Sequence, residues 1–338
     1  MDTKIYTVND LPQAAKEIQN GNLVSFPTET VYGLGADATN EVAVKSVYAA
    51  KGRPSDNPLI VHVDSIKMVE KYAQPLSEAA KKLISTFWPG PLTIIFKLKP
   101  GSLSKAVTGG LDTAAFRNPN NKVTLGLIKE AGVPIVGPSA NTSGKPSPTT
   151  AQHVYHDLKG KIAGILDDGT SKFGVESTVL DMSTDTPAIL RPGAVTSDDI
   201  SKIIGPVLDE HHKVAKNEVP KAPGMKYKHY APNAQVYIID HEDDWSDALV
   251  WASKQNSPVG MMATDSRIAE FIIPDNVETF SLGQDVNSAS HLLFAGLRHF
   301  DDESEVKSIL TQSFDANGIG EAYMNRLNKS AGQTHFTK

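Results

Sequence analysis

The strongest constraint on the fold is a change in apolar spacing on the two sides of Pro54 and Pro58. Before them, apolar residues at helical spacing follow the capping residue Asn40 and predict a helix that ends near Lys51. Neither proline allows that helix to continue. After them, apolar residues alternate from 59 to 63 and predict a strand. A helix that leads directly into a strand indicates an α/β fold.

The same alternation of elements extends along the chain. In the first part, strands are predicted at 23–26, 59–63, 92–98, 114–117, 133–136, 165–167, 178–181 and 188–191, with helices at 40–51, 77–88 and 123–131. After Pro232, strands at 236–240, 259–263 and 277–282 alternate with helices at 245–253, 287–300 and 321–329. We therefore expect a mixed sheet in the first part and a small Rossmann-like sheet in the second.

The domain boundaries follow from a stretch without apolar periodicity. Residues 206–232 are rich in lysine and end in a run that contains Tyr230. With 338 residues the chain is long enough for two cores. We expect a first domain at 1–205, a linker at 206–232 and a second domain at 233–338. The linker is either a plain spacer or a lid whose tyrosines and lysines meet a nucleotide.

Composition narrows the class of protein. The chain has a formal net charge of −6 and no cysteine. Without cysteine, disulfides, thiolate nucleophiles, zinc–thiolate sites and iron–sulfur clusters are excluded. The negative charge means that phosphate binding has to come from locally placed Lys and Arg. The sequence carries no signal-peptide pattern and no apolar run of the ~18 residues that span a membrane, so we expect a soluble, cytoplasmic protein.

Two stretches predict anion binding. Lys51 and Arg53 are two residues apart, so both would project to one face if the stretch is extended. This pair suits a polyanion, and a surface cation pair beside a turn is an equal alternative. The run of residues 137–148 is rich in Gly, Ser and Asn, whose hydroxyls and amides suit a phosphate or carboxylate. A plain turn is the alternative there.

Other local patterns are weak. Gly33-Leu34-Gly35 lies too far from the preceding strand for a dinucleotide fingerprint, and no strand is expected to lead into Gly318. His153 and His156 are three apart on an expected helix, without a carboxylate motif to complete a metal site. We therefore predict no metal site made of protein ligands.

Several stretches together resemble one family. They are Phe26 to Gly35 (FPTETVYGLG), Lys51-Gly52-Arg53-Pro54, Ser139 to Gly144 (SANTSG), Gly174 to Val179 (GVESTV), Leu190 to Gly193 (LRPG), Pro223 to Pro232 and Gly318 to Leu327. The chain resembles the two-domain threonylcarbamoyl-AMP synthases over nearly its whole length. This resemblance implies a twisted mixed-sheet YrdC-like domain with a smaller Rossmann-like second domain.

The resemblance also implies an activity and its residues. It implies a nucleotidyltransferase that converts L-threonine, bicarbonate or CO2, and ATP into threonylcarbamoyl-AMP, with Mg²⁺ carried by the ATP phosphates. The positions that match threonine-binding residues are Thr30, His62, Arg117, Gly137 and Ser177. The positions that match ATP-binding residues are Arg53, Asn57, Thr113, Ser139, Ser147, Arg191 and Tyr230. Lys51 and Arg53 match the catalytic cations, and Asn141 completes the S-x-N motif.

These residue types suit the implied chemistry. The carbamate of threonine is already an anion, so it needs no activated Ser or Cys to attack the α-phosphate. The carbamate and the ATP phosphates are both anions and have to be brought together. Cations and backbone amides positioned around the phosphates can offset their repulsion. Arg117 is the natural clamp for the threonine carboxylate, and Lys51, Arg53 and Arg191 are candidate phosphate cations.

Two alternatives stay open. YrdC-like domains also occur in carbamoyltransferases that adenylate carbamoyl phosphate. A non-enzymatic module that binds double-stranded RNA is the second alternative. For the synthase we expect a downstream tRNA threonylcarbamoyl transferase complex as partner, and a weak contact with tRNA or double-stranded RNA.

Overall fold

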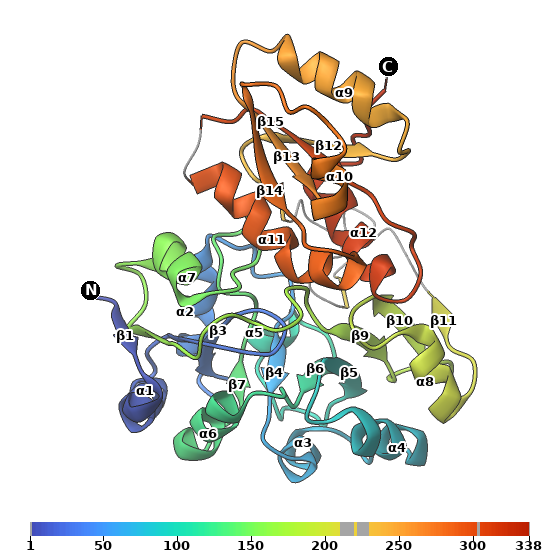
Figure 1. Ribbon diagram of the computed structural model, residues 1–338. Helices are drawn as coiled ribbons and strands as arrows, with labels where there is room; N and C mark the ends of the chain where they lie inside the picture. Colours follow the sequence, from blue (N-terminus) through green and yellow to red (C-terminus); the bar gives the residue numbers. More distant parts are fainter. Residues whose placement is uncertain (1, 210–219, 222–229, 303–304, 338) are drawn as a thin grey trace. The chain divides into compact units, whose positions relative to one another are not determined.

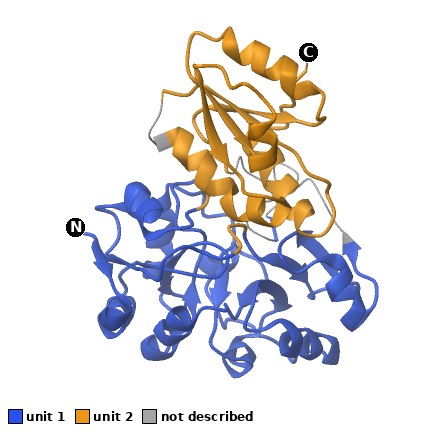
Figure 2. Ribbon diagram, viewed as in Figure 1, with its two compact units in different colours: residues 1–143, 148–172, 176–227 blue, residues 144–147, 173–175, 228–338 orange. Residues whose placement is uncertain are grey.

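The computed structural model describes residues 2–209, 220–221, 230–302 and 305–337, which form two compact units (Figure 2). Unit 1 comprises residues 1–143, 148–172 and 176–227, and unit 2 comprises 144–147, 173–175 and 228–338. Within the linker expected at 206–232, residues 210–219 and 222–229 lie outside the described residues. Two short segments of the first part of the chain, 144–147 and 173–175, therefore belong to unit 2.

Unit 1 is built on one mixed sheet of eleven strands in the order β1-β8-β2-β3-β7-β4-β6-β5-β9-β10-β11. The strands are β1 (Lys4–Tyr6), β2 (Val24–Phe26), β3 (Gly33–Asp37), β4 (Ile60–His62), β5 (Leu92–Lys97), β6 (Thr113–Arg117), β7 (Ile135–Val136), β8 (Gly164–Leu166), β9 (Thr178–Asp181), β10 (Ala188–Arg191) and β11 (Leu208–Asp209). Pairs β4–β6 and β5–β9 are parallel, whereas β5–β6, β3–β7 and β9–β10 are antiparallel. The mixed sheet expected from the sequence is confirmed.

Helices connect these strands. They are the 3-10 turn η1 (Val8–Asp10), α1 (Leu11–Gln19), α2 (Glu41–Lys51), α3 (Ile66–Tyr72), α4 (Glu78–Phe87), α5 (Lys105–Thr108), α6 (Lys122–Ala131), α7 (Ala151–Leu158) and α8 (Ser197–Ile204). Helices α1, α6, α3 and α4 lie along one side of the sheet (Figure 1). In the described part of the chain, no helix is both long and apolar enough to cross a membrane.

Capping residues mark the helix ends, and the cap expected at Asn40 is confirmed. The Asn40 side chain accepts hydrogen bonds from Val42 N and Ala43 N at the start of α2, and Ser77 accepts one from Ala80 N at the start of α4. Gly52 ends α2 in the left-handed conformation, with φ of 63°. Helix α2 buries Val44, Val47 and Tyr48 in the core of unit 1. The capping residues and the buried face agree on the bounds of α2, and they place Lys51 as its last residue.

Unit 2 has a parallel sheet of four strands in the order β12-β15-β13-β14. Its elements are β12 (Gln235–Ile239), α9 (Asp244–Ser253), β13 (Val259–Ala263), α10 (Asp265–Ala269), β14 (Val277–Ser281), α11 (Val286–Asp302), β15 (Ser308–Gln312) and α12 (Ile319–Ala331). Strands that alternate with helices in a parallel sheet confirm the Rossmann-like expectation.

Three details differ from the sequence-based expectations. Residues 51–53 are not extended, because Lys51 is the last residue of α2 and Gly52 turns the chain. The Gly33-Leu34-Gly35 sequence is itself part of strand β3. A strand, β15, does precede Gly318, and sequence reasoning missed it because its five residues show no clear alternation of apolar and polar residues.

Candidate active site

The site begins at the loop between β2 and β3, which the hydroxyl of Thr28 organises. Thr28 Oγ1 accepts hydrogen bonds from Thr30 N at 3.1 Å and Val31 N at 3.2 Å, and it donates to Val31 O at 2.6 Å. Thr124 Oγ1, at the start of α6, donates to Pro27 O. These bonds are a local hydroxyl turn. They hold the backbone of residues 28–31 in one conformation.

Arg117 connects this loop to the sheet. It is the last residue of β6 and pairs in register with His62, the last residue of β4. Its Nη1 donates to Thr30 Oγ1 at 2.8 Å, and its Nη2 lies 2.7 Å from Glu29 Oε1. The side chains of Arg117 and Glu29 are 4% and 3% exposed. A guanidinium at the end of a buried strand is thus brought against a hydroxyl and a carboxylate.

Gly137 lies directly against His62. A Cβ at Gly137 would lie 2.7 Å from His62 Nδ1 and 2.5 Å from Phe26 Cζ, so this position has no room for a side chain. The rings of Phe26 and His62 meet edge to face with centroids 5.1 Å apart. Burial, and then the positive charge of Arg117, lowers the pKa of His62 to about 3, so the imidazole is neutral near pH 7.

Ser177 stands at the start of β9 and is held by Arg191 of β10. Arg191 Nε and Nη2 donate to Ser177 O at 3.1 and 2.9 Å, and Nη2 also donates to Ser177 Oγ at 3.2 Å. Ser177 Oγ also shares a 2.7 Å hydrogen bond with Thr93 Oγ1 of β5. Arg117 Nε donates to Gly90 O at 3.4 Å, just before β5. The segment at the start of β5 therefore lies between Arg117 and the Ser177–Arg191 pair.

Lys51 is brought to the loop that follows β7. Its side chain is buried, and Nζ donates to Ser139 O, to Asn141 O at 2.6 Å and to Asn141 Oδ1 at 3.3 Å. Ser139 Oγ donates to the same Asn141 Oδ1 at 2.6 Å. Lys51, Ser139 and Asn141, which are distant in the chain, thus form one cluster. A bridge between Gly33 and Ser139 places this cluster beside the Thr30 loop.

Arg53 and Asn57 lie in the segment between α2 and β4, and both are buried. Arg53 Nη2 donates to Pro58 O at 3.4 Å. Tyr48 OH donates to Asn57 O at 3.1 Å, and burial raises the pKa of Tyr48 to about 12, so this hydroxyl remains a donor near pH 7. Thr113 is at the opposite end of β6 from Arg117, roughly 13 Å away along the strand. Thr113 is therefore not brought into the cluster around Thr30.

The remaining two expected nucleotide residues belong to unit 2. Ser147 is fully buried, and Tyr230 has a φ of 66° and packs against Phe294 with ring centroids 5.1 Å apart. The segment 144–147 is fixed within unit 2 by Lys145, whose Nζ lies 2.7 Å from Asp301 Oδ2.

Sequence reasoning did not single out Glu29 or Thr93. Glu29 lies inside the Pro27-Thr28-Glu29-Thr30 motif, but nothing local in the sequence indicates that its partner is Arg117. Of the two histidines on α7, His156 places Nδ1 3.0 Å from Asp157 Oδ1. Within the described ranges, no three His, Asp or Glu side chains come together as metal ligands.

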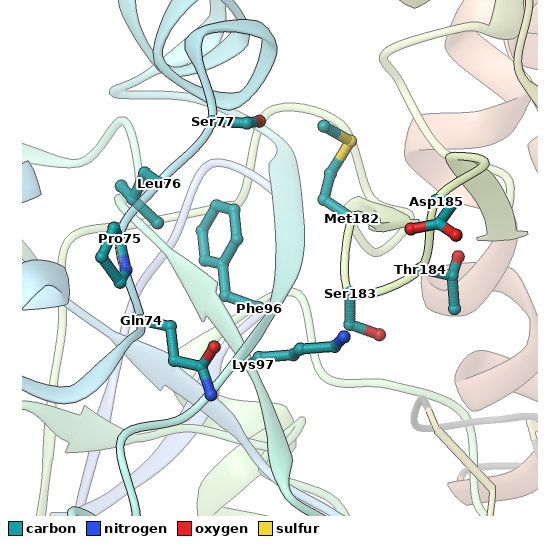
Figure 3. A pocket seen from close by; sticks show the side chains of 10 residues that line it. All are labelled: Gln74, Pro75, Leu76, Ser77, Phe96, Lys97, Met182, Ser183, Thr184 and Asp185. Carbon is teal, nitrogen blue, oxygen red and sulfur yellow. The ribbon is translucent and has the colours of Figure 1, made fainter.

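A pocket of about 380 Å³ lies at the other end of β5 and β9 (Figure 3). Its lining comes from the segment before α4, the end of β5 and the turn after β9, and comprises Gln74, Pro75, Leu76, Ser77, Phe96, Lys97, Met182, Ser183, Thr184 and Asp185. Ser177 precedes β9, so the pocket is roughly 17 Å along that strand from Ser177. It contains none of the expected site residues.

Comparison with known proteins assigns the family. Residues 16–193 match the family model described as Telomere recombination, and residues 195–332 match the model described as Threonylcarbamoyl-AMP synthase, C-terminal domain. A Bacillus subtilis protein named threonylcarbamoyl-AMP synthase is 46% identical over 95% of this chain and 93% of its own. This chain belongs to the threonylcarbamoyl-AMP synthase family.

Other members of the threonylcarbamoyl-AMP synthase family agree in sequence and structure. A Pyrococcus abyssi protein of the same name is 43% identical over 94% of this chain and 93% of its own. The crystal structure of P. abyssi Sua5 complexed with L-threonine superposes with a TM-score of 0.92 at 39% identity, over 100% of both chains. The family and the two-domain fold implied by the sequence motifs are therefore confirmed.

Proposed function

We propose that this protein forms threonylcarbamoyl-AMP and pyrophosphate from L-threonine, bicarbonate or CO2, and ATP, for the threonylcarbamoyladenosine modification of tRNA. The observation that carries the proposal is the buried cluster of Arg117, Thr30 and His62, in a chain similar along nearly its whole length to proteins named threonylcarbamoyl-AMP synthase. Because one such relative was crystallised with L-threonine, the amino acid is the natural occupant of this cluster.

The cluster has the chemistry that threonine needs. The guanidinium of Arg117 can hold a carboxylate with paired hydrogen bonds, which lysine cannot do in the same geometry. Thr30 and Ser177 provide hydroxyls, and neutral His62 offers a ring nitrogen, Nδ1, that is buried without a hydrogen-bond partner. A neutral imidazole can either donate to or accept from the threonine hydroxyl. Gly137, which has no side chain, lets its backbone lie directly against His62, and in this proposal it contributes a backbone contact to threonine.

The cations serve the second half of the reaction. The uncharged threonine amine and bicarbonate give a carbamate and water, and a carbamate oxygen attacks the α-phosphorus of ATP while pyrophosphate leaves. Lys51, Arg53 and Arg191 offset the repulsion between the carbamate and the phosphates, and orientation supplies much of the acceleration. In this role Lys51 exchanges part of its bonding to Ser139 and Asn141 for phosphate oxygens. We place the nucleotide against Asn57, Thr113, Ser139 and Ser147.

Magnesium belongs to the same proposal as a companion of ATP. Mg²⁺ prefers phosphate oxygens and retained water molecules to a cage of protein ligands. It would offset charge on the triphosphate, while Lys51 and Arg53 hold the oxygens that it leaves uncovered. A Mg²⁺ titration at fixed ATP tests this, because turnover should follow the concentration of the Mg–ATP complex.

The partners and the compartment extend the proposal. Carbamoyl adenylates are labile, so the product has to pass to a tRNA threonylcarbamoyl transferase. This protein itself contacts tRNA weakly. Tyr230 is the candidate to cover the nucleotide and exclude water. ATP, threonine and tRNA are all present in the cytoplasm, where we place the reaction.

The test is pyrophosphate release from Mg–ATP, with threonine and bicarbonate omitted in turn. We expect release only with both, and a rate lowered about 30- to 1,000-fold in Arg53→Ala, which corresponds to ~2–4 kcal/mol of lost phosphate stabilisation. Lys45→Ala is the matched control, because Lys45 is an exposed cation on α2 that forms a surface ion pair with Glu41. Release driven by carbamoyl phosphate without threonine would instead assign the carbamoyl-transfer reaction.

A further inference from the structure

Glu29 is a buried carboxylate to which the proposed function assigns no role. The residue is 4% exposed and its carboxylate contacts the guanidinium of Arg117 at 2.7 Å. Neither carboxylate oxygen accepts a hydrogen bond from any part of the chain that the structure describes. A buried carboxylate is normally satisfied by several donors, because removal from water is costly. Glu29 therefore retains acceptor capacity inside the site.

Charge balance defines what could use that capacity. Arg117 and Glu29 are neutral as a pair, and His62 beside them is uncharged. If Arg117 takes the carboxylate of a substrate, the buried site acquires a net charge of −1. An α-amino acid brings the compensating charge itself, because its ammonium is attached to the carbon that bears the carboxylate. A directly adjacent Arg–Glu pair is thus complementary to a zwitterion.

We propose that Glu29 binds the ammonium group of L-threonine while Arg117 binds its carboxylate. This assignment rests on the proposed function and names the group that recognises the amine. The Glu29 carboxylate has space to turn from Arg117 towards the ammonium group, because Glu29 also lines a pocket of about 90 Å³ together with Asn120, Asn121 and Asp168. The Thr28 turn keeps the backbone of Glu29 fixed, so only its side chain has to reorient.

The alternative role for Glu29 is to hold Arg117 in place. The two roles differ in how a substrate without an amine should behave. (R)-3-Hydroxybutyrate has the carboxylate, the hydroxyl and the configuration of L-threonine but lacks the amino group. If Glu29 only positions Arg117, its loss weakens both compounds equally. If Glu29 binds the ammonium, its loss weakens L-threonine selectively.

The experiment measures binding of both compounds to the full-length protein by calorimetry, with a non-hydrolysable ATP analogue and without bicarbonate. For Glu29→Gln we expect L-threonine to bind at least tenfold more weakly. (R)-3-Hydroxybutyrate should change less than threefold or bind more tightly, since the net negative charge is relieved. If the probe is too weak to measure on the unchanged protein, its binding should become measurable in Glu29→Gln.

An equal loss for both compounds, or an unchanged threonine affinity, overturns the assignment. Glu29→Asp is the second variant, for the case that Glu29→Gln does not fold. It keeps the charge but shortens the side chain by one methylene, and should again weaken L-threonine more than the probe. A protein that binds neither compound before any substitution would count against the proposed function, not against the role of Glu29 within it.

Discussion

A single methyl group at Gly137 tests the geometry of the threonine cluster. In Gly137→Ala, the new Cβ would lie 2.5 Å from Phe26 Cζ, 2.7 Å from His62 Nδ1 and 2.8 Å from His62 Cε1. Carbon atoms in contact normally lie ~3.5–4.0 Å apart, so two rings have to move by roughly 1 Å. Both rings are buried in the core of unit 1. Overpacking of this kind costs ~1–3 kcal/mol of unfolding free energy.

The matched control is Gly126→Ala in the middle of α6. There the new Cβ meets only Leu11 Cδ1, at 2.9 Å, which is the far end of a flexible side chain. Replacing Gly by Ala inside a helix also contributes ~0.8–1 kcal/mol of helix propensity. We therefore expect Gly126→Ala to be neutral or slightly stabilising, so that a loss at position 137 cannot be attributed to the added methyl group as such.

The assay follows urea unfolding of unit 1 by tryptophan fluorescence. The chain has three tryptophans, of which Trp88 is in unit 1 and Trp245 and Trp251 are in unit 2. In a Trp245→Phe, Trp251→Phe background, Trp88 reports unit 1 alone; its Nε1 donates to Leu92 O at 2.7 Å, at the start of β5. We expect a lower unfolding midpoint for Gly137→Ala and a KM for threonine that rises more than the KM for ATP.

An unchanged midpoint together with an unchanged KM for threonine would refute this reasoning. A double-mutant cycle sharpens the test, because Phe26→Leu removes the ring carbon nearest to the new methyl group. Gly137→Ala should then cost less in the Phe26→Leu background than in the unchanged protein. An equal cost in both backgrounds would mean that the clash with Phe26 is not the cause.

Two further predictions concern titration and the linker. Because the pKa of His62 is lowered to about 3 in the folded protein and is about 6.5 when unfolded, the unfolding free energy should fall as pH drops from about 6.5 towards 3, by up to ~1.4 kcal/mol per pH unit. His62→Gln should show a shallower fall between pH 6 and 4.5, and identical slopes would count against the buried neutral imidazole. Asp181 is buried and accepts from Lys221 Nζ at 2.9 Å, while Lys221 is 44% exposed. An ion pair of this kind contributes ~0.5–1 kcal/mol, so Asp181→Asn should speed tryptic cleavage after Lys221 about two- to fivefold. Cleavage after Lys202 should stay unchanged. An equal rate of cleavage after Lys221 in the variant and the unchanged protein would show that the ion pair does not protect this bond.

Much of the fold followed from local patterns. The cap at Asn40, the prolines at positions 54 and 58 and the alternation from 59 to 63 predicted α2 and β4, because each signal depends on residues within a few positions of one another. The same reasoning missed β15, whose residues carry no local signal that separates a buried strand from its alternatives. It also considered an extended Lys51–Arg53 segment, whereas Gly52 turns the chain at the end of α2.

The candidate site was visible in part. Motif likeness pointed to Thr30, His62 and Arg117, and the structure brings these three together. Motif likeness did not point to Glu29, because the role of a carboxylate depends on the charged group that lies beside it in the folded protein. Thr30 and Arg117 are 87 positions apart in the sequence, and Lys51 and Asn141 are 90 apart. No spacing rule covers such distances.

The sequence by itself determined most of the longer helices and strands, the two-domain plan and the family, since these rest on short-range periodicity and on contiguous motifs. Only the tertiary structure decided that Arg117 ends its strand between Thr30 and Glu29, that Gly137 leaves no space beside His62, and that residues 144–147 belong to unit 2. The physical reason is burial. His62 is neutral, and the Glu29 oxygens lack hydrogen-bond donors, because folding removes both side chains from water. Their neighbours in the folded sheet are distant in the sequence.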